Sequence, residues 1–265
     1  AISIITNKVS QAASEWQNRP LESLYMIVWM DGIVFKVREN GKVINKTVYL
    51  CVGLNKEGLK EVLGMWVGKN ESAAFWMGVL TDLKARGVED ILITVTDNLN
   101  GFTETIKSVF PTSTTQICVV HQIRNSCRYV VWKEKKEFTS DLKNIYNAPT
   151  KEAAKMELEN FEQKWGTKYP YAIRSWRNNW EELTVFFDFP VEIRKIIYTT
   201  NLIENLNGKI RKYTKNKLSF PNDDALKKSV YLAITEIEKK WYQPIWNWAL
   251  IFNQFITIFE NRIQV

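Results

Sequence analysis

The chain has 265 residues, which is long enough to bury a full hydrophobic core in one large domain or in one domain with an inserted lobe. Its composition, 45% hydrophobic and 25% charged, excludes wholesale disorder, and its net charge of +7 favours a polyanionic partner. His121 is the only histidine, which excludes every site that needs two histidines, such as the HExxH zinc proteases.

Strand signals follow a polar N-terminal stretch. Residues 1–22 are predicted to form a short helix and a linker. From Leu24 an apolar run is followed by alternating apolar and polar residues. Asn40-Gly41 then favours a two-residue hairpin turn, because such a turn needs positive φ at both positions. The strands expected in this part of the chain are 24–30 with 33–38, 46–54 and 61–67.

Helices and strands then alternate. A helix capped by Asn70 and stopped at Gly87 precedes a buried strand at 91–95, and a helix at 101–109 precedes a strand at 115–120. A three-stranded meander followed by right-handed crossovers can place the first strand beside the fourth in a mixed sheet. This order is the ribonuclease H-like pattern, and the predicted fold class is α/β.

The second half of the chain is predicted to be helical. Residues 122–198 are rich in Lys and Glu and contain no convincing strand run, so we interpret them as an all-α insertion. A helix from Thr199 carries Glu204, and two more helices follow, one at about 223–240 and one after Pro244. The predicted domains are a helix and linker at 1–22, a ribonuclease H-like core with C-terminal helices at 23–121 and 199–265, and the insertion at 122–198.

Three acids stand where carboxylates could meet. Asp31 follows the first apolar run, Asp97 follows the strand at 91–95, and Glu204 lies just ahead of a basic stretch. Three carboxylates on rigid elements can hold two hard divalent cations, two Mg²⁺ with Mn²⁺ as a substitute, for phosphodiester chemistry on nucleic acid. Alternatively, Asp31 and Asp97 are turn or cap residues, and Glu204 forms a capping box with Asn201 as N-cap.

Two basic stretches could supply phosphate contacts, although either could be an ordinary solvated helix face. The first contains Lys209, Arg211, Lys212, Lys215 and Lys217, and the second contains Arg124, Arg128, Lys133, Lys135 and Lys136. Cys118, His121 and Cys127 offer at most three zinc ligands at irregular spacing. Otherwise His121 is a packed core residue or borders the active site. The tryptophans of the insertion are core residues, or one of them stacks on an unpaired base.

Several segments together resemble the Mutator-type transposases of bacterial insertion sequences. The likeness runs in order from about Trp16 to Val265 and includes segments with no catalytic role. The segments that carry it are Met30-Asp31-Gly32-Ile33, Thr96-Asp97-Asn98-Leu99-Asn100-Gly101-Phe102, Cys118-Val119-Val120-His121-Gln122-Ile123-Arg124-Asn125 and Thr199-Thr200-Asn201-Leu202-Ile203-Glu204-Asn205-Leu206-Asn207.

The resemblance implies a DDE transposase, a metal-dependent enzyme that cuts DNA strands and transfers them. The catalytic and metal-binding triad maps onto Asp31, Asp97 and Glu204, and the family's Cys-x-x-His motif maps onto Cys118 and His121 as active-site support. The expected DNA-binding residues are Arg124, Lys209, Arg211, Lys212 and Lys215. The expected partners are transposon ends and target DNA, and a homodimer or higher oligomer on DNA.

The chain departs from the family pattern in two ways. The family usually has Gly after the second Asp, where this chain has Asn98, which also tolerates left-handed φ. Family members carry a helical DNA-binding region ahead of the catalytic domain, and we expect that portion to be missing from a chain that begins at Ala1. We therefore expect this chain to bind DNA with little sequence preference.

Two other functions fit the same residues. One is a metal-dependent nuclease on the same core that cuts DNA without joining it, and the other is a decayed or repurposed transposase that only binds DNA. The three cysteines suit a reducing cytosol, where the protein would associate with the nucleoid. No apolar stretch approaches the ~20 residues of a membrane span.

Overall fold

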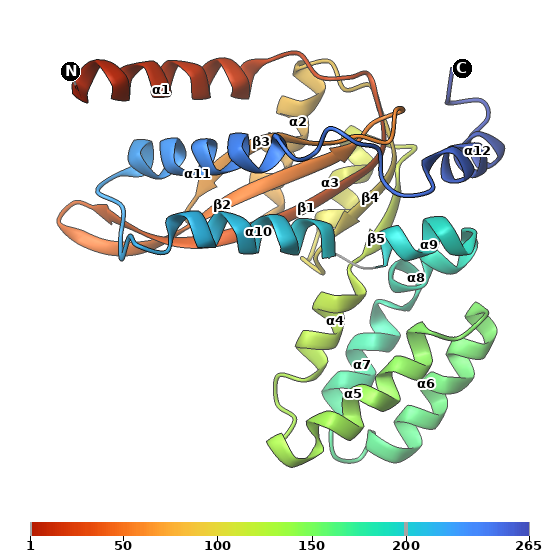
Figure 1. Ribbon diagram of the computed structural model, residues 1–265. Helices are drawn as coiled ribbons and strands as arrows, with labels where there is room; N and C mark the ends of the chain where they lie inside the picture. Colours follow the sequence, from red (N-terminus) through yellow and green to blue (C-terminus); the bar gives the residue numbers. More distant parts are fainter. Residues whose placement is uncertain (1, 199–200, 265) are drawn as a thin grey trace. The chain divides into compact units, whose positions relative to one another are not determined.

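A mixed five-stranded sheet carries the first part of the chain, in the computed structural model, which describes residues 2–198 and 201–264 (Figure 1). The strands are β1 (Leu24–Glu39), β2 (Lys42–Leu54), β3 (Lys60–Gly68), β4 (Asp90–Thr96) and β5 (Thr114–Ile117), in the order β3-β2-β1-β4-β5. β1 pairs with β2 and β2 with β3 in antiparallel fashion, whereas β1 and β4 are parallel. The prediction that the first strand lies beside the fourth is confirmed.

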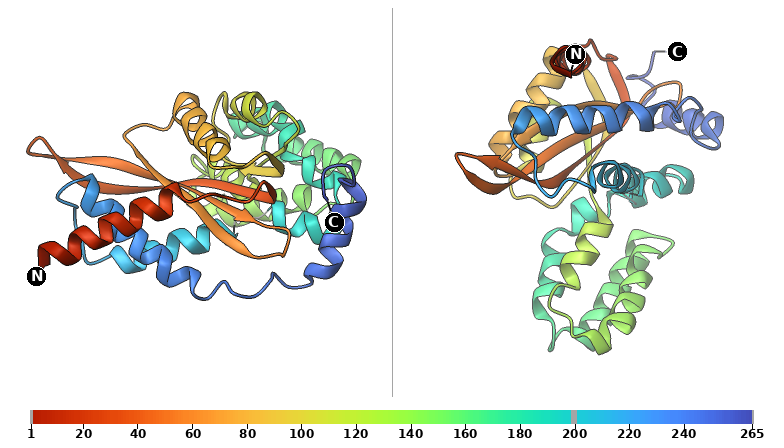
Figure 2. Two further views of the ribbon diagram at one scale, coloured as in Figure 1. Left: turned by 90° about the horizontal axis from the view of Figure 1, so that it is seen from above. Right: turned by 60° about the vertical axis from the view of Figure 1, so that its left-hand side comes forward.

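The chain divides into two units, which are described separately. The first unit comprises Ala1–Thr114 and Asn201–Val265, and the second comprises Thr115–Thr200. Within the first unit, α2 (Ala73–Ala85) and α3 (Phe102–Val109) cover one face of the sheet. The other face carries α10 (Asn201–Thr214) and α11 (Asp223–Glu238), with α1 (Ile2–Asn18) beside α11 (Figure 2). The last helix is α12 (Trp248–Ile258).

The hairpin between β1 and β2 forms at the expected position. Asn40 and Gly41 both have positive φ, 51° and 77°, as a two-residue turn of this type requires. β1 itself is longer than expected: it is one strand of 16 residues, and the break that we placed at Asp31 and Gly32 does not exist. Asp31 therefore lies inside a strand, not at its end, because Gly32 continues the extended backbone and pairs with Tyr49 of β2.

Two other boundaries differ from the expected ones. The side chain of Ser72, not Asn70, caps α2 by accepting a hydrogen bond from the N–H of Phe75 at 3.1 Å. β5 ends at Ile117 rather than at residue 120, because the Cys118 side chain caps a helix that begins at Val119. Apolar β-branched residues such as Val119 suit a strand, but here a buried helix face accommodates them.

The core of the first unit packs between the sheet and the α2–α3 layer. Val28 and Met30 of β1 belong to a cluster with the buried aromatic side chains of α2 and α3. Trp76 and Phe102 stack at 4.7 Å between ring centroids, and both are almost fully buried. Since side chains of a strand alternate between faces, Trp29 and Asp31 point to the opposite face, where α10 and α11 lie.

In the second unit, residues 115–117 belong to β5, and the regular structure of the other described residues is helical. Its helices are α4 (Val119–Ser126), α5 (Trp132–Tyr146), α6 (Lys151–Trp165), α7 (Pro170–Asn178), α8 (Trp180–Leu183) and α9 (Val191–Ile197), with a short 3-10 helix at Val185–Asp188. Phe138 packs edge to face against Phe161, Trp165 and Tyr169. Trp165 and Trp176 are core residues, but Trp132 is 86% exposed. None of the helices described in either unit is long and apolar enough to cross a membrane.

Candidate active site

Two aspartates meet where the parallel pairing of β1 and β4 ends. The last paired residues are Trp29 and Val95, and two residues further along each strand direction stand Asp31 and Asp97. Because side chains repeat their direction every second residue, both carboxyl groups leave the same face of the sheet. Each offers an oxygen atom within 4.8 Å of an oxygen of the other. The two acids thus meet because their strands are parallel neighbours in this register.

Asp31 is buried and hydrogen-bonded on both oxygens. The residue is only 9% exposed. Oδ1 accepts the backbone N–H of Gly32 at 2.8 Å, and Oδ2 accepts the Nδ2 amide of Asn207 at 2.6 Å. Both of these donors are neutral, so they orient the carboxylate without neutralising its charge.

Asn207 was not predicted as a site residue. It lies on α10 and is buried, and its amide ties this helix to β1 at the position of Asp31. A signal was available in the sequence, since Asn207 is three residues after Glu204, and residues three apart lie on the same side of a helix. A search of the positions three and four residues from Glu204 would have found Asn207.

Glu204 lies in the first turns of α10 and is half-buried. α10 begins at Asn201, so Asn201 is a helical residue rather than the N-cap that the capping-box alternative requires. Thr199 and Thr200, where we expected the helix to start, lie outside the described residues. The carboxylate of Glu204 does not lie within 4.8 Å of both aspartates, so the structure brings together two of the three predicted acids.

The donor set around Asp31 suits a hard cation. Two carboxylates this close repel each other, and burial of one of them increases the energetic cost of its charge. Oxygen ligands of this kind are what Mg²⁺ and Mn²⁺ prefer in proteins. Asp31 and Asp97 therefore fit a divalent cation, with neutral hydrogen bonds holding Asp31 in place.

The predicted basic residues of α10 do not all face the same way. At 3.6 residues per turn, Arg211 lies only about 20° around the helix from Glu204, whereas Lys212 lies about 80° and Lys209 about 140° away. Lys209 and Lys212 instead line a groove between α10 and α11. Lys215 follows the end of α10 and is exposed. Of these side chains, Arg211 shares the helix face of Glu204.

The Cys-x-x-His segment begins the first helix of the second unit. The Cys118 thiol accepts the backbone N–H of His121 at 3.3 Å and so caps α4, which gives Cys118 a structural role. Burial raises the pKa of the Cys127 thiol, which disfavours the thiolate that zinc requires. Neither cysteine belongs to a cluster of three metal-ligating side chains within the described residues. Arg124, on the same helix, is exposed.

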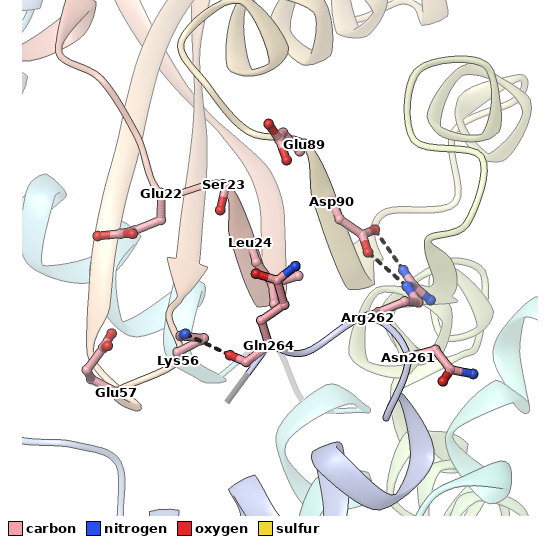
Figure 3. A pocket seen from close by; sticks show the side chains of 10 residues that line it. All are labelled: Glu22, Ser23, Leu24, Lys56, Glu57, Glu89, Asp90, Asn261, Arg262 and Gln264. Carbon is pink, nitrogen blue, oxygen red and sulfur yellow. Dashed lines mark hydrogen bonds and ion pairs between the residues drawn. The ribbon is translucent and has the colours of Figure 1, made fainter.

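A separate pocket of about 250 Å³ lies at the opposite end of β1 and β4, beside Leu24 and Asp90 (Figure 3). Arg262 donates two hydrogen bonds to the Asp90 carboxylate, at 2.7 and 2.8 Å, and Lys56 donates one to the carbonyl of Gln264 at 3.1 Å. Asp31 lies seven positions after Leu24 on β1, a distance of roughly 23 Å along an extended strand. This pocket is therefore remote from the paired aspartates.

Known proteins match nearly the whole chain. A family model described as "Transposase, Mutator family" matches residues 1–244. The "Probable transposase for insertion sequence element ISRM3-like" of Sinorhizobium fredii is 44% identical over 262 residues, which cover 98% of this chain and 66% of that protein. The "Transposase for insertion sequence element ISRM3" of Rhizobium meliloti gives the same identity and coverage. This chain therefore spans 66% of the length of these two relatives.

A more distant relative and one solved structure extend the comparison. The "Probable transposase for insertion sequence element" of Corynebacterium diphtheriae is 40% identical over 240 residues, covering 90% of this chain and 70% of that protein. A chain in the cryoEM structure of a simian T-cell lymphotropic virus intasome in complex with PP2A regulatory subunit B56 gamma covers 56% of this chain and 50% of its own length. Its sequence identity is 15% and its TM-score is 0.27. Likeness at that level carries no argument about this fold.

Proposed function

Because the chain belongs to the Mutator family of transposases, we propose that it is the catalytic part of an enzyme that cuts and joins DNA. The proposed fold of this part is the ribonuclease H-like core, with the second unit as an all-α insertion. The strand order and the parallel β1–β4 pair support that assignment.

The meeting of Asp31 and Asp97 is the observation that carries the proposal. A buried acid has little structural reason to stand within 4.8 Å of a second acid on a neighbouring strand. A site for a divalent cation explains the arrangement.

Asp31, Asp97 and Glu204 are proposed to hold two Mg²⁺ ions, for which Mn²⁺ can substitute. When bound, such ions activate the attacking oxygen and stabilise the leaving oxygen of an in-line displacement at phosphorus. The chain's own part is to fix the ligands. Asn207 and the Gly32 N–H orient the Asp31 carboxylate, and α10 presents Glu204 from the same layer.

Positively charged side chains are proposed to hold the DNA. Arg211, on the Glu204 face of α10, would contact phosphate next to the carboxylates, and Lys215 would extend that contact beyond the helix end. Lys209, Lys212 and Arg124 are further phosphate contacts. His121 is proposed to position the scissile phosphate, and Cys118 supports it by capping the helix turn that carries it.

The proposed partners are the ends of an insertion sequence and a target duplex. Strand transfer joins two DNA segments, so a homodimer or higher oligomer on DNA is the expected assembly. Base readout needs an element that enters a groove of the duplex, whereas the residues named above contact phosphates. This chain alone is thus expected to bind DNA of any sequence with similar affinity.

The test is a comparison of Asp97→Asn with the unmodified chain. The substitution removes one negative charge from the carboxylate pair and should reduce Mg²⁺-dependent strand cleavage by roughly 10³-fold or more, because cation stabilisation is worth several kcal/mol. DNA binding should be retained, since the phosphate contacts come from Lys and Arg. Cleavage is followed on labelled oligonucleotides, and Mn²⁺ binding by calorimetry. Glu104→Gln, at an exposed acid on α3, is the matched control.

Unchanged cleavage by Asp97→Asn would contradict the proposed chemistry. A strand-transfer assay, in which the cut 3′ end is joined to a second duplex, separates a transposase from a nuclease on the same core. A chain that binds DNA but neither cuts it nor takes up Mn²⁺ would be a binding protein derived from the family.

A further inference from the structure

A groove of about 430 Å³ runs between α10 and α11, on the sheet face opposite to α2 and α3. The two helices are in contact, and Figure 1 shows α10 next to α11. The residues that line the groove are Lys209, Lys212, Tyr213, Glu236, Ile237 and Lys240. Ile237 is buried, whereas the charged residues of the lining are exposed.

The charge of this groove is strongly positive. Lys209, Lys212 and Lys240 are exposed, and none of them pairs with a carboxylate within 4 Å among the residues that the structure describes. The acid of the groove, Glu236, forms an ion pair with Lys239, so its charge is already compensated. Three lysines therefore share one groove with a single carboxylate, Glu236, which already pairs with Lys239.

Lys60 of β3 adds to the same positive field. Its ammonium group lies 5.1 Å from the centre of the Trp241 ring, just after the end of α11. Burial lowers the pKa of Lys60, and the positive charge of Lys209 lowers it further. Repulsion between two lysines of different elements is a cost to the folded chain that a bound anion would remove.

This groove is separate from the carboxylates. Lys209 lies about 140° and Lys212 about 80° around α10 from Glu204, so the groove opens on a different side of the helix from Glu204. An α-helix with its side chains is about 10–12 Å across, which is longer than the reach of a side chain from one side to the other. A phosphate held by Lys209 on the far side of α10 would therefore be a different one from the phosphate that the carboxylates would attack.

We propose that the α10–α11 groove is a second phosphate site, which binds the DNA backbone at a position away from the bond that is cut. The proposal rests on the proposed function for the identity of the ligand. Lysine suits this task because its ammonium group binds phosphate as a point charge and needs no fixed geometry. Tyr213, which is 59% exposed, offers a hydroxyl donor and an aromatic surface beside the lysines. DNA would therefore be held on both sides of α10.

The test is the salt dependence of duplex binding by Lys209→Gln/Lys212→Gln. Binding of a labelled 30-base-pair duplex is measured by anisotropy with EDTA present, at about 50–200 mM salt. Each phosphate contact contributes about 0.9 to the slope of log K against log[salt], so the double variant should lose nearly 2 from the slope and bind at least about tenfold more weakly at 0.1 M. Lys240→Gln, on the other wall, should lose about half of that slope.

The control carries the same charge change elsewhere. Lys42→Gln/Lys107→Gln removes two exposed lysines, one in the β1–β2 hairpin and one on α3, and should keep the slope of the unmodified chain. Equal slopes for the groove and control variants, with unchanged melting temperatures, would overturn the groove site. So would absence of duplex binding by the unmodified chain. Loss of the proposed function is read separately, as absence of Mg²⁺-dependent cleavage by the unmodified chain.

Discussion

The two halves of β1 are stabilised by different forces. From Tyr25 to Met30 every residue is buried, because β4 pairs with the strand as far as Trp29, β2 pairs with it from Ile27 onward and helices cover both faces. From Gly32 to Glu39 the burial alternates, and β4 no longer pairs with the strand. There the free edge is covered by Phe220, whose N–H donates to the Lys36 carbonyl and whose carbonyl accepts from the Arg38 N–H, both at 2.8 Å.

The second half also depends on charge. Lys46 of β2, opposite Phe35, is 6% exposed and donates hydrogen bonds to Asp223 at 2.7 and 2.8 Å and to Glu39 at 3.0 Å. Asp31 stands at the junction of the two halves. A strand that leaves its parallel neighbour at this point frees space beside the last paired residues, and that space is where the carboxylates meet. The carboxylates can therefore meet at the junction because the pairing of β1 with β4 ends there.

The largest loss of stability is expected in the apolar half. Trp29 is fully buried, so Trp29→Ala should reduce the free energy of unfolding by about 3–5 kcal/mol, through lost burial and the cavity left behind. Val34 of the second half is 54% exposed, and Val34→Ala is expected to change the free energy of unfolding by no more than about 0.5 kcal/mol. Urea unfolding of both variants measures the difference. Equal losses would mean that the two halves do not differ as described.

An intermediate loss is expected at the junction. A Cβ on Gly32 would lie 2.7 Å from Cγ2 of Thr47 on the paired strand, which is too close for a real contact. Gly32→Ala should therefore cost about 1–3 kcal/mol of unfolding free energy through overpacking. Thr47→Ser removes that methyl group, so the double variant should recover part of the loss. No recovery would show that the cost comes from the backbone of Gly32 and not from this contact.

The smallest loss is expected at Lys46. Lys46→Met keeps the aliphatic stem and removes the charge, and we expect a loss of about 1 kcal/mol at pH 7, because the partner carboxylates are partly exposed. Hydrogen bonding to Asp223 raises the pKa of Lys46. The charged lysine therefore stabilises the folded chain at pH values below its unfolded pKa of about 10.4, and this stabilisation is lost as the pH rises through the folded pKa.

The contribution of Glu39 to stability depends on pH in the opposite direction to that of Lys46. Hydrogen bonds from Lys69, and to a smaller extent from Lys46, lower the pKa of Glu39. The ionised carboxylate therefore stabilises the folded chain at pH values above its unfolded pKa of about 4.3, and this stabilisation is lost as the pH falls through the folded pKa. The cost of Lys46→Met should therefore shrink between pH 7 and pH 3 in urea titrations, with Lys42→Met as the exposed control. A cost that does not change with pH would assign the role of Lys46 to packing.

The strand order followed from the sequence because the hairpin turn and the apolar runs are local signals. Asn40-Gly41 fixes its turn through the φ angles that both residues favour, and the apolar run ending at Val95 could only be a buried strand. The approach of Asp31 and Asp97 could be predicted from the same order. It required only that β1 and β4 be parallel neighbours.

Other features depended on tertiary packing, which the local pattern does not contain. The strand expected to reach residue 120 ends at Ile117, since the Cys118 side chain caps a helix there. Asp31 looked like the end of a strand because the apolar run stops, whereas the strand continues with one exposed face. Helical spacing places Asn207 on the side of α10 that carries Glu204, but its hydrogen bond to Asp31 depends on the packing of α10 against β1. The predicted site roles of Glu204, Cys118 and His121 stay predictions.

The contacts of Phe220 and Asn207 have a mechanical consequence. α10 and the segment that follows it are fastened to β1 at two points, Asp31 through Asn207 and the 36–38 backbone through Phe220. α10 cannot slide along β1, because a shift of one helical turn, about 5.4 Å, would break both attachments together. Rotation about its own long axis would break the first attachment alone. The freedom left to Glu204 relative to Asp31 is therefore mainly that of its own side chain.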